Sequence, residues 1–453
     1  MEHIVCKFGG SSVATRQRIE QVASIIEENP RRRCIVLSAP GKAPGIDVKV
    51  TDMLLAISRK SLEEEDISAE VAAVRKRYHD IYKPLGVGES GVEEVLNILD
   101  RRIQADKTDP LRYRDSLVAS GEDLNARLFA KYLTIRGNDA CYLSPQEANL
   151  LVTSSFGDAQ PLNKTTKNLK ILKKLITEKI VVFPGFFGVT KDGHIATFSR
   201  GGSDLTGALL AEAIDAGEYE NFTDVNGIFS ANPTIVESPE QIPALTYKEM
   251  RELSYIGFNV LHEEAVKPVM FKMIPIRLRN TNNLKNDGTL IVAERLPSER
   301  DVIGIASGGR YCSFTLQKFL MNREKGFGRR LLAIFEDLNL SFEHCPSGVD
   351  NISVILDQTQ LKPGSANAVI RTIEKELSPD FIKTEFDLSL IAVVGEGLIQ
   401  KVGLLSQAAQ ALANAGVNIK MVNQGSSEIS VIFGIDAEDE SEAVNALYKE
   451  FFS

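Results

Sequence analysis

The stretch KFGGSSV, residues 7–13, joins a lysine to a glycine pair and a serine pair directly after a short apolar run. A lysine ammonium group can stabilise a phosphoryl group, and glycines let backbone N–H groups approach an anion closely. In a P-loop the lysine follows the glycines, whereas Lys7 precedes Gly9 and Gly10. The stretch is therefore not a P-loop. Taken alone, a glycine pair after a strand is more often a tight connection, and a phosphate site of a different kind is the functional alternative.

A second glycine pair, in FSRGGSDLTGALLAEAI at residues 198–214, repeats this design. The pair follows a predicted strand, and Ser203 and Asp204 are expected to cap the helix that begins there. Helix capping leaves Arg200 unexplained, and a guanidinium group at a helix entrance offers a bidentate grip on a carboxylate or phosphate. The two glycine pairs together predict two anionic ligands that face each other.

Further polar positions have ordinary structural explanations when each is taken alone. Thr51 is expected as the N-cap of a helix, and Glu122 lies in the first turn of another, where an acid interacts favourably with the helix dipole. The run FTDVNGI, residues 222–228, has the composition of a polar turn and is expected to follow a helix. These positions gain a functional interpretation only as a set.

Positioning these residues requires a framework of alternating strands and helices. The runs HIVCKF and RRRCIVLSAP end in glycine or proline turns, as buried strands do, and a helical pattern separates them. Strands are predicted again at 179–190 and 194–199, with a helix at about 204–216. This alternation predicts an α/β sheet with helices on both faces, whose ligands lie at the carboxyl ends of the strands.

The last third of the chain contains an internal repeat. RRLLAIFEDLNLSFEHCPSGVDNISVILD, from Arg329, and VGLLSQAAQALANAGVNIKMVNQGSSEISVIFGID, from Val402, share a helix, a turn of small residues, a strand, a Ser/Gly turn and a second strand. Chance similarity is the alternative, and the matched order of these elements argues against it. We predict two small βαββ-type modules, with connecting segments at about 294–302 and 384–389.

Composition limits the classes of partner and compartment. A chain of 453 residues suggests about two to four domains. The net charge of −9 argues against nucleic acid and anionic membranes as partners, and we find neither a membrane-spanning run nor a signal peptide. The five cysteines form no CxxC pair and indicate reduced thiols in a cytoplasmic protein. We expect no protein-held metal, because Val266 stands where a zinc-protease helix beginning at His262 needs a second histidine.

As an ordered set, the motifs resemble those of the aspartate kinases in the amino acid kinase family, over essentially the whole chain. KFGGSSV is similar to their N-terminal signature, FSRGGSDLTGALLA to their second glycine loop, FTDVNGI to their nucleotide segment and the repeated modules to their paired ACT domains. Within the family the chain most resembles the lysine-responsive, monofunctional branch. The resemblance implies a catalytic domain over 1–298 and ACT domains over 299–386 and 387–453, with a strand near 301–307 packed with the second module.

The resemblance implies an activity: ATP-dependent phosphorylation of the side-chain carboxylate of L-aspartate to 4-phospho-L-aspartate, the first step of lysine, threonine and methionine biosynthesis. Mg²⁺ would be carried mainly by the nucleotide phosphates. The attacking carboxylate is already ionised at neutral pH, so no general base is required. Lys7 and Asp204 are implied as catalytic residues. Contacts to ATP are implied for Lys7, Gly9, Gly10, Ser11, Thr223, Asp224 and Gly227, and contacts to aspartate for Ser38, Thr51, Glu122, Phe186, Arg200, Gly201 and Ser203.

Feedback regulation through the ACT modules follows from the same resemblance. L-lysine is the expected effector, with threonine as a rival, and a homodimer through the ACT domains or a tetramer is the expected assembly. Effector contacts are implied for Met321, Gly326, Phe327, Glu343 and Ser347.

The chain also departs from the family on the nucleotide side. Many relatives carry an Asp-Pro-Arg-type run where this chain has Asn232 and Thr234, and a lysine where it has Asn259. An amino-acid sensor with an inactive kinase domain would show such changes. A sibling kinase acting on glutamate, acetylglutamate or a nucleotide is a further alternative, which the set of Thr51, Glu122 and Arg200 argues against.

Overall fold

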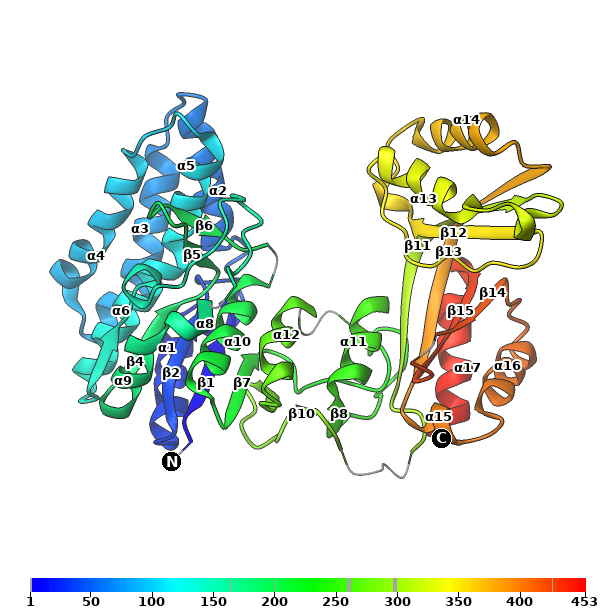
Figure 1. Cartoon of the computed structure of the whole chain (residues 1–453). Helices are drawn as coiled ribbons and strands as arrows, with labels where there is room; N and C mark the ends of the chain where they lie inside the picture. The colour runs from blue at the N-terminus through cyan, green and yellow to red at the C-terminus, as the bar shows by residue number, and fades with distance from the viewer. Residues whose placement is uncertain are drawn as a thin grey trace. The chain divides into compact units, whose positions relative to one another are not determined.

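The computed structural model divides into two compact units (Figure 1). Unit 1 comprises Met1–Ile228, Gln241–Met250 and Asn259–Leu296, and unit 2 comprises Phe229–Glu240, Arg251–Phe258 and Pro297–Ser453. The structure describes residues 2–163, 165–199, 201–258, 261, 263–295, 300–425 and 427–453. Over these ranges no helix combines the length and apolar character needed to cross a membrane.

Unit 1 is built on an eight-stranded sheet with the strand order β3-β4-β2-β1-β7-β9-β10-β8. Strands β1, β2, β3, β4, β7 and β9 pair in parallel, and β10 runs antiparallel to β9. The prediction of an α/β sheet is therefore confirmed. The strands are β1 (Ile4–Phe8), β2 (Arg32–Leu37), β3 (Ala140–Tyr142), β4 (Ile180–Pro184), β7 (Glu218–Thr223), β8 (Ala244–Thr246), β9 (Ile276–Asn280) and β10 (Thr289–Val292).

Strand β7 corrects the sequence analysis, which expected a helix directly before the FTDVNGI turn. Its letters EYENFT are too polar to indicate a central strand. The buried carboxylate of Glu220 is compensated by two cations on other strands: Arg32 Nε lies 2.6 Å away and Arg279 Nη1 3.2 Å away. Phe222 also stacks on Phe8 of β1, with ring centroids 4.6 Å apart. Residues distant in sequence thus stabilise a strand that its own composition does not predict.

Helices cover both faces of this sheet (Figure 1). Cys6 and Phe8 pack in an apolar cluster with helices from the first third of the chain, while the intervening Lys7 contacts α10. Successive strand residues point to opposite faces, so α10 lies on the other side. The first set is α1 (Arg16–Glu28), α2 (Val50–Leu62), α3 (Ser68–Tyr82), α4 (Gly88–Ile103), α5 (Pro110–Val118) and α6 (Ser120–Ile135); the second includes α8 (Thr165–Asn168), α9 (Lys170–Glu178), α10 (Gly202–Ile214) and α12 (Glu263–Phe271).

The strand predicted at 194–199 belongs to a separate hairpin instead of the large sheet. Strands β5 (Phe187–Val189) and β6 (Ile195–Thr197) pair antiparallel with each other. The helix α7 (Pro145–Ala148) precedes this region, and α11 (Tyr247–Ile256) follows β8.

Unit 2 contains a five-stranded antiparallel sheet with the order β12-β11-β13-β15-β14. The segment 384–389, which we expected to connect two modules, lies inside the long strand β13 and is not a connector. Residues Gly304–Gly308 pair with β13 where β13 also pairs with β15. Both repeats therefore share one sheet. Its strands are β11 (Gly304–Gln317), β12 (Asn351–Asp357), β13 (Phe381–Val394), β14 (Met421–Gln424) and β15 (Ser430–Asp436).

The two repeats are similar but not identical. Each opens its first helix after a glycine with positive φ, 77° at Gly326 and 96° at Gly403. Each also has a helix after its last strand that the sequence analysis did not include, Ser365–Leu377 in one and Glu440–Phe452 in the other. The first strand of the C-terminal repeat is β14, whereas the N-terminal repeat has only isolated bridges there, including His344 to Ile355. The helices are α13 (Phe327–Asp337), α14 (Ser365–Leu377), α15 (Gly397–Gln400), α16 (Leu404–Asn414) and α17 (Glu440–Phe452).

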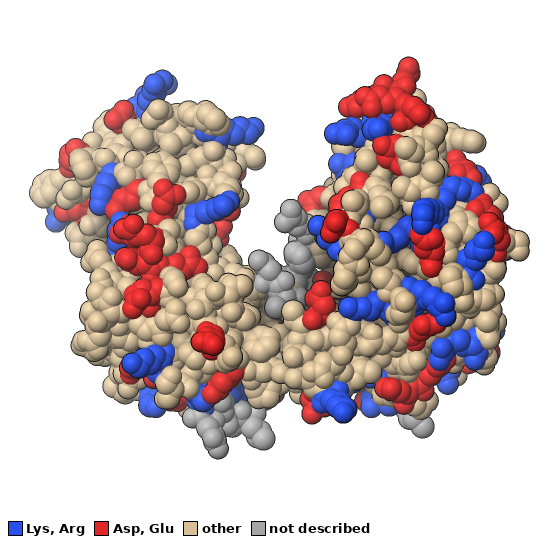
Figure 2. Space-filling view, turned by 180° about the vertical axis from the view of Figure 1, so that it is seen from behind, with Lys and Arg blue, Asp and Glu red and all other residues tan. Residues whose placement is uncertain are grey.

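Charged side chains are distributed over the surface of each unit. Figure 2 shows Lys and Arg side chains interspersed with Asp and Glu on the visible face. Such mixing of both signs is typical of solvated protein surface.

Candidate active site

The two residues predicted as catalytic form a buried ion pair. Lys7 lies near the carboxyl end of the central strand β1, and Asp204 lies in the first turn of α10. Lys7 Nζ is 2.6 Å from Asp204 Oδ1, and only 11% and 12% of the two side chains are exposed. The pair lies on the face of the sheet that α10 covers, so the fold brings both glycine motifs to one place.

Asp204 is available for this pair because it does not cap the helix, contrary to the expectation. The N-cap is Gly201, with φ of 76°, and α10 begins at Gly202, so Ser203 and Asp204 lie inside the first turn. A Cβ at Gly202 would lie 2.8 Å from Phe198 Cβ, which explains the need for glycine. The backbone makes this turn, and the Asp204 carboxylate is directed to Lys7.

The first glycine pair is not followed directly by the helix that the sequence predicts between the first two strands. Residues Gly10–Val13 form a single 3₁₀ turn, and α1 begins at Arg16. Glycine is needed at position 10 because the segment that follows β2 passes close to it. Gly41 N–H donates to Gly10 O at 2.8 Å, and a Cβ at Gly10 would lie 2.9 Å from Ala39 O. At Gly9, a Cβ would lie 3.6 Å from Lys7 Nζ. This loop therefore brings bare backbone, with Ser11 next to it, close to the Lys7 ammonium group.

Glu122 lies in the first turn of α6, as predicted, but it is not a surface acid at a helix dipole. Only 5% of the Glu122 surface is exposed, and Oε1 accepts a hydrogen bond from Ala39 N–H at 3.1 Å. Oε2 is buried and has no hydrogen-bond partner among the described residues. Burial raises the pKa of Glu122 to about 8. A cationic group placed beside Oε2 by a ligand would favour the ionised form of Glu122 and pair with it.

The remaining positions predicted for the substrate lie on neighbouring elements. Thr51 lies inside α2, whose N-cap is Lys49, so its expected capping role is wrong. Ser38 directly follows β2, and its carbonyl accepts a hydrogen bond from Asn125 Nδ2 at 2.8 Å. Phe186 follows β4 with φ of 76°. Arg200, predicted to grip a carboxylate, lies outside the described residues.

Gly185 shows how closely the substrate-side elements approach each other. A Cβ at Gly185 would lie 2.5 Å from Ser203 Oγ, so the segment after β4 passes directly against the start of α10.

The positions predicted for the nucleotide follow strand β7. Thr223 ends this strand, and its hydroxyl donates to Asp224 Oδ1 at 3.3 Å. Gly227 has φ of 138°, and a Cβ there would lie 2.5 Å from Thr289 Oγ1, so only glycine fits. Asn232 accepts hydrogen bonds from Thr234 in a local turn. Asn259 lies outside the described residues.

The predicted effector residues lie in and directly before the N-terminal repeat of unit 2. Met321, Gly326 and Phe327 lie in the segment that leads into α13. Glu343 N–H donates to Ile355 O at 2.7 Å, and Ser347 bridges to β12. Met321 and Gly326 thus precede α13, Phe327 is its first residue, and Glu343 and Ser347 lie opposite strand β12.

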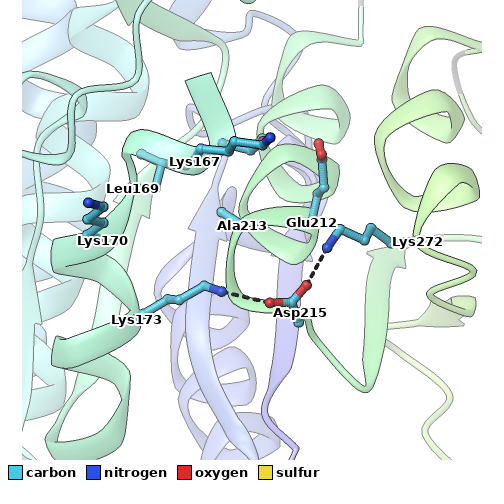
Figure 3. A pocket seen from close by; sticks show the side chains of 9 residues that line it. Lys167, Leu169, Lys170, Lys173, Glu212, Ala213, Asp215 and Lys272 are labelled. Carbon is cyan, nitrogen blue, oxygen red and sulfur yellow. Dashed lines mark hydrogen bonds and ion pairs between the residues drawn. The ribbon is translucent and has the colours of Figure 1, made fainter. Parts of the chain in front are cut away.

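A separate cavity of about 390 Å³ lies at the other end of α10 (Figure 3). Asp215 is the C-cap of this helix, and its carboxylate lies 2.7 Å from both Lys173 Nζ of α9 and Lys272 Nζ after α12. Lys167 and Lys170 also line the cavity. Asp215 and Asp204 lie at opposite ends of α10, so these ion pairs tie three elements together away from Lys7.

Sequence reasoning missed Asn221, which contacts both members of the Lys7–Asp204 pair. The residue lies on β7, the strand that the sequence analysis did not predict. A pairing of β1 with β7 would have placed Asn221 beside Lys7, because the two residues are register partners.

Comparison with known proteins agrees with this architecture. The family model of the amino acid kinase family matches residues 2–280, and that of the ACT domain matches residues 391–451. The chain is 45% identical to Aspartokinase 3 of Bacillus subtilis (strain 168) over 449 residues, which cover 99% of this chain and 98% of the relative.

Solved structures agree as well. The aspartate kinase of Clostridium acetobutylicum has a TM-score of 0.87 at 35% identity, covering 99% of this chain and 100% of that chain. Aspartokinase III of E. coli in complex with aspartate and ADP has a TM-score of 0.80 at 25% identity, and its complex with lysine and aspartate 0.79 at 25%, with full coverage of both chains in each case. The chain therefore belongs to the amino acid kinase family, as an aspartate kinase with a C-terminal ACT domain.

Proposed function

We propose that this aspartate kinase transfers the γ-phosphoryl group of ATP to the side-chain carboxylate of L-aspartate and forms 4-phospho-L-aspartate, the first step of lysine, threonine and methionine biosynthesis. The buried Lys7–Asp204 pair is the observation that carries this proposal. Phosphoryl transfer needs positioning and charge stabilisation more than covalent chemistry, and a desolvated ammonium group supplies the charge. The E. coli relative solved with aspartate and ADP supports the choice of ligands.

On the phosphate side, Lys7 would contact the transferring phosphoryl group, and the backbone of Gly9, Gly10 and Ser11 would line its oxygens. Thr223, Asp224 and Gly227 would contact the nucleotide. Asp204 Oδ1 is already engaged by Lys7 and Asn221, which fits Mg²⁺ carried by the nucleotide phosphates. The metal would neutralise charge on the β- and γ-phosphates.

On the substrate side, we assign the aspartate ammonium group to Glu122. Its Oε2, buried and without a partner among the described residues, supports this assignment. Thr51, Ser38, Phe186, Gly201 and Ser203 would complete the pocket. Arg200 remains the residue proposed for the α-carboxylate.

A hydroxamate assay tests the reaction and the substrate directly. Hydroxylamine traps acyl phosphates, so ATP with L-aspartate should yield a hydroxamate, and ATP with L-glutamate, the matched control acid, should yield at least tenfold less at equal concentration. Product from glutamate alone would overturn the substrate assignment. No product from either acid, with lysine still binding in calorimetry, would instead favour the amino-acid sensor with an inactive kinase domain.

For regulation, we propose a catalytic domain over 1–298 and ACT domains over 299–386 and 387–453, the first of which binds L-lysine. Glu343 would receive an ammonium group, and Gly326 leaves backbone N–H groups accessible to a carboxylate. The E. coli relative solved with lysine and aspartate supports the ligand. ACT domains of two copies would pair in a homodimer, which could assemble further into a tetramer.

Titration of lysine against initial rate at limiting aspartate should show inhibition at millimolar lysine. A coupling free energy of about 1–3 kcal/mol is typical of such regulation. Glu343→Gln should shift the inhibition curve to higher lysine while the rate without lysine stays the same. Threonine, tested alone and together with lysine, is the control effector. A response to threonine alone would reassign the effector site to threonine. No response to either amino acid would refute the proposed regulation.

A further inference from the structure

Strand β7 supports Asp204 at two points. Tyr219 and Asn221 alternate along this strand, so both side chains point to the face that α10 covers. Tyr219 OH donates to the backbone carbonyl of Asp204 at 3.1 Å, and Asn221 Nδ2 donates to its carboxylate Oδ1 at 2.8 Å. A Cβ at Gly207 of α10 would lie 2.5 Å from Tyr219 OH, so the helix leaves room for this contact.

Asn221 also reaches the other member of the ion pair. It is the register partner of Lys7 on the neighbouring strand, and its Oδ1 accepts a hydrogen bond from Lys7 Nζ at 3.4 Å. The three side chains therefore form a closed triangle, in which Asn221 donates to Asp204 and accepts from Lys7. Asn221 is only 2% exposed, so water has little access to replace either hydrogen bond.

We propose that Asn221 is a positioning residue, which holds the Lys7 ammonium group and the Asp204 carboxylate in the arrangement needed for phosphoryl transfer. The inference rests on the proposed role of Lys7 at the phosphoryl group. A neutral amide suits this task because it orients both charges without adding one. A second carboxylate would offset the positive charge that Lys7 presents to the phosphoryl group, and an apolar side chain would orient neither partner.

Two substitutions separate positioning from mere packing. Asn221→Leu keeps the branch point at Cγ and removes both hydrogen bonds, and we expect kcat to fall about tenfold to a hundredfold, with the KM for aspartate changed less than threefold. Asn221→Asp keeps the shape and adds a charge beside Asp204, where two carboxylates disfavour joint ionisation. For this variant, we expect the ratio of its kcat to that of the native enzyme to rise as pH is lowered from 8.5 to 5.5, a trend that Asn221→Leu should not show.

Steady-state kinetics at saturating ATP over a range of aspartate concentrations, with thermal melting of each protein, provide the test. Asn97→Asp, at an exposed site in α4, adds the same charge and should leave kcat unchanged. Lys7→Ala separates the two proposals. If Lys7→Ala is inactive while a folded Asn221→Leu has the native kcat, the positioning role of Asn221 is overturned and the proposed role of Lys7 stands. A folded Lys7→Ala with native kcat would overturn the proposed role of Lys7 and with it the inference. If Asn221→Leu does not fold, the pH dependence of Asn221→Asp is the deciding test. A ratio of its kcat to the native kcat that does not change with pH would overturn the positioning role of Asn221.

Discussion

Lys7→Ala is expected to lower kcat by about a thousandfold, the scale seen when a preorganised charge or donor is removed from a developing anion. The ammonium group lies in a site where little water can substitute for it, since its side chain is 11% exposed. The substitution also leaves Asp204 buried without its cation, which should lower the free energy of unfolding by about 3 kcal/mol. Turnover by the hydroxamate assay and thermal melting measure the two effects separately.

A matched lysine controls for loss of charge in general. Lys76 of α3 has a side chain that is 74% exposed and pairs with Asp80 one helical turn away. Lys76→Ala should change both kcat and stability little, because exposed pairs contribute about 0–1 kcal/mol. A Lys7→Ala protein that melts as a folded enzyme and turns over at the native rate would contradict the assignment of Lys7 to the phosphoryl group.

Glu122→Gln is expected to raise the KM for aspartate by about tenfold to a hundredfold, the equivalent of a hydrogen-bonded charge pair, with a smaller effect on kcat. The pH dependence gives a sharper test. Burial raises the pKa of Glu122 to about 8 from its ordinary value of 4.5, so the free enzyme holds this group largely neutral below pH 8. Only the ionised form attracts an ammonium group, so KM for aspartate should fall as pH rises from 6 to 8, and the fall should disappear in Glu122→Gln.

The free energy of unfolding should fall as pH rises, whereas the affinity for aspartate should increase. The unfolded chain releases the Glu122 proton near pH 4.5 and the folded protein near pH 8, so this group destabilises the fold progressively across that window. Glu122→Gln should remove this contribution. Glu94→Gln, at a side chain 71% exposed, is the control and should change neither profile. Identical KM profiles for Glu122→Gln and the native enzyme would move the ammonium contact to another residue.

Local sequence was sufficient to predict the elements whose hydrophobic pattern indicates both their type and their burial. The apolar runs of β1, β2 and β4 predicted buried strands, and the spacing in α1 and α10 predicted helices, because each pattern matches one period. The glycine pairs indicated close backbone approach, and a Cβ would indeed lie 2.9 Å from Ala39 O at Gly10 and 2.8 Å from Phe198 Cβ at Gly202. The roles of Lys7, Asp204 and Glu122 came from the resemblance of these motifs to those of the aspartate kinases.

The tertiary structure alone decided what surrounds those residues. Strand β7 is polar in sequence and becomes a central strand because Arg32 and Arg279, from other strands, compensate Glu220. Asn221 gains its contacts only through the pairing of β7 with β1. Glu122 and Asp204 lie in first helical turns where a carboxylate is ordinarily exposed, and packing against distant segments buries both. Periodicity is a property of neighbours along the chain, whereas the burial and charge that set reactivity depend on residues that only folding brings together.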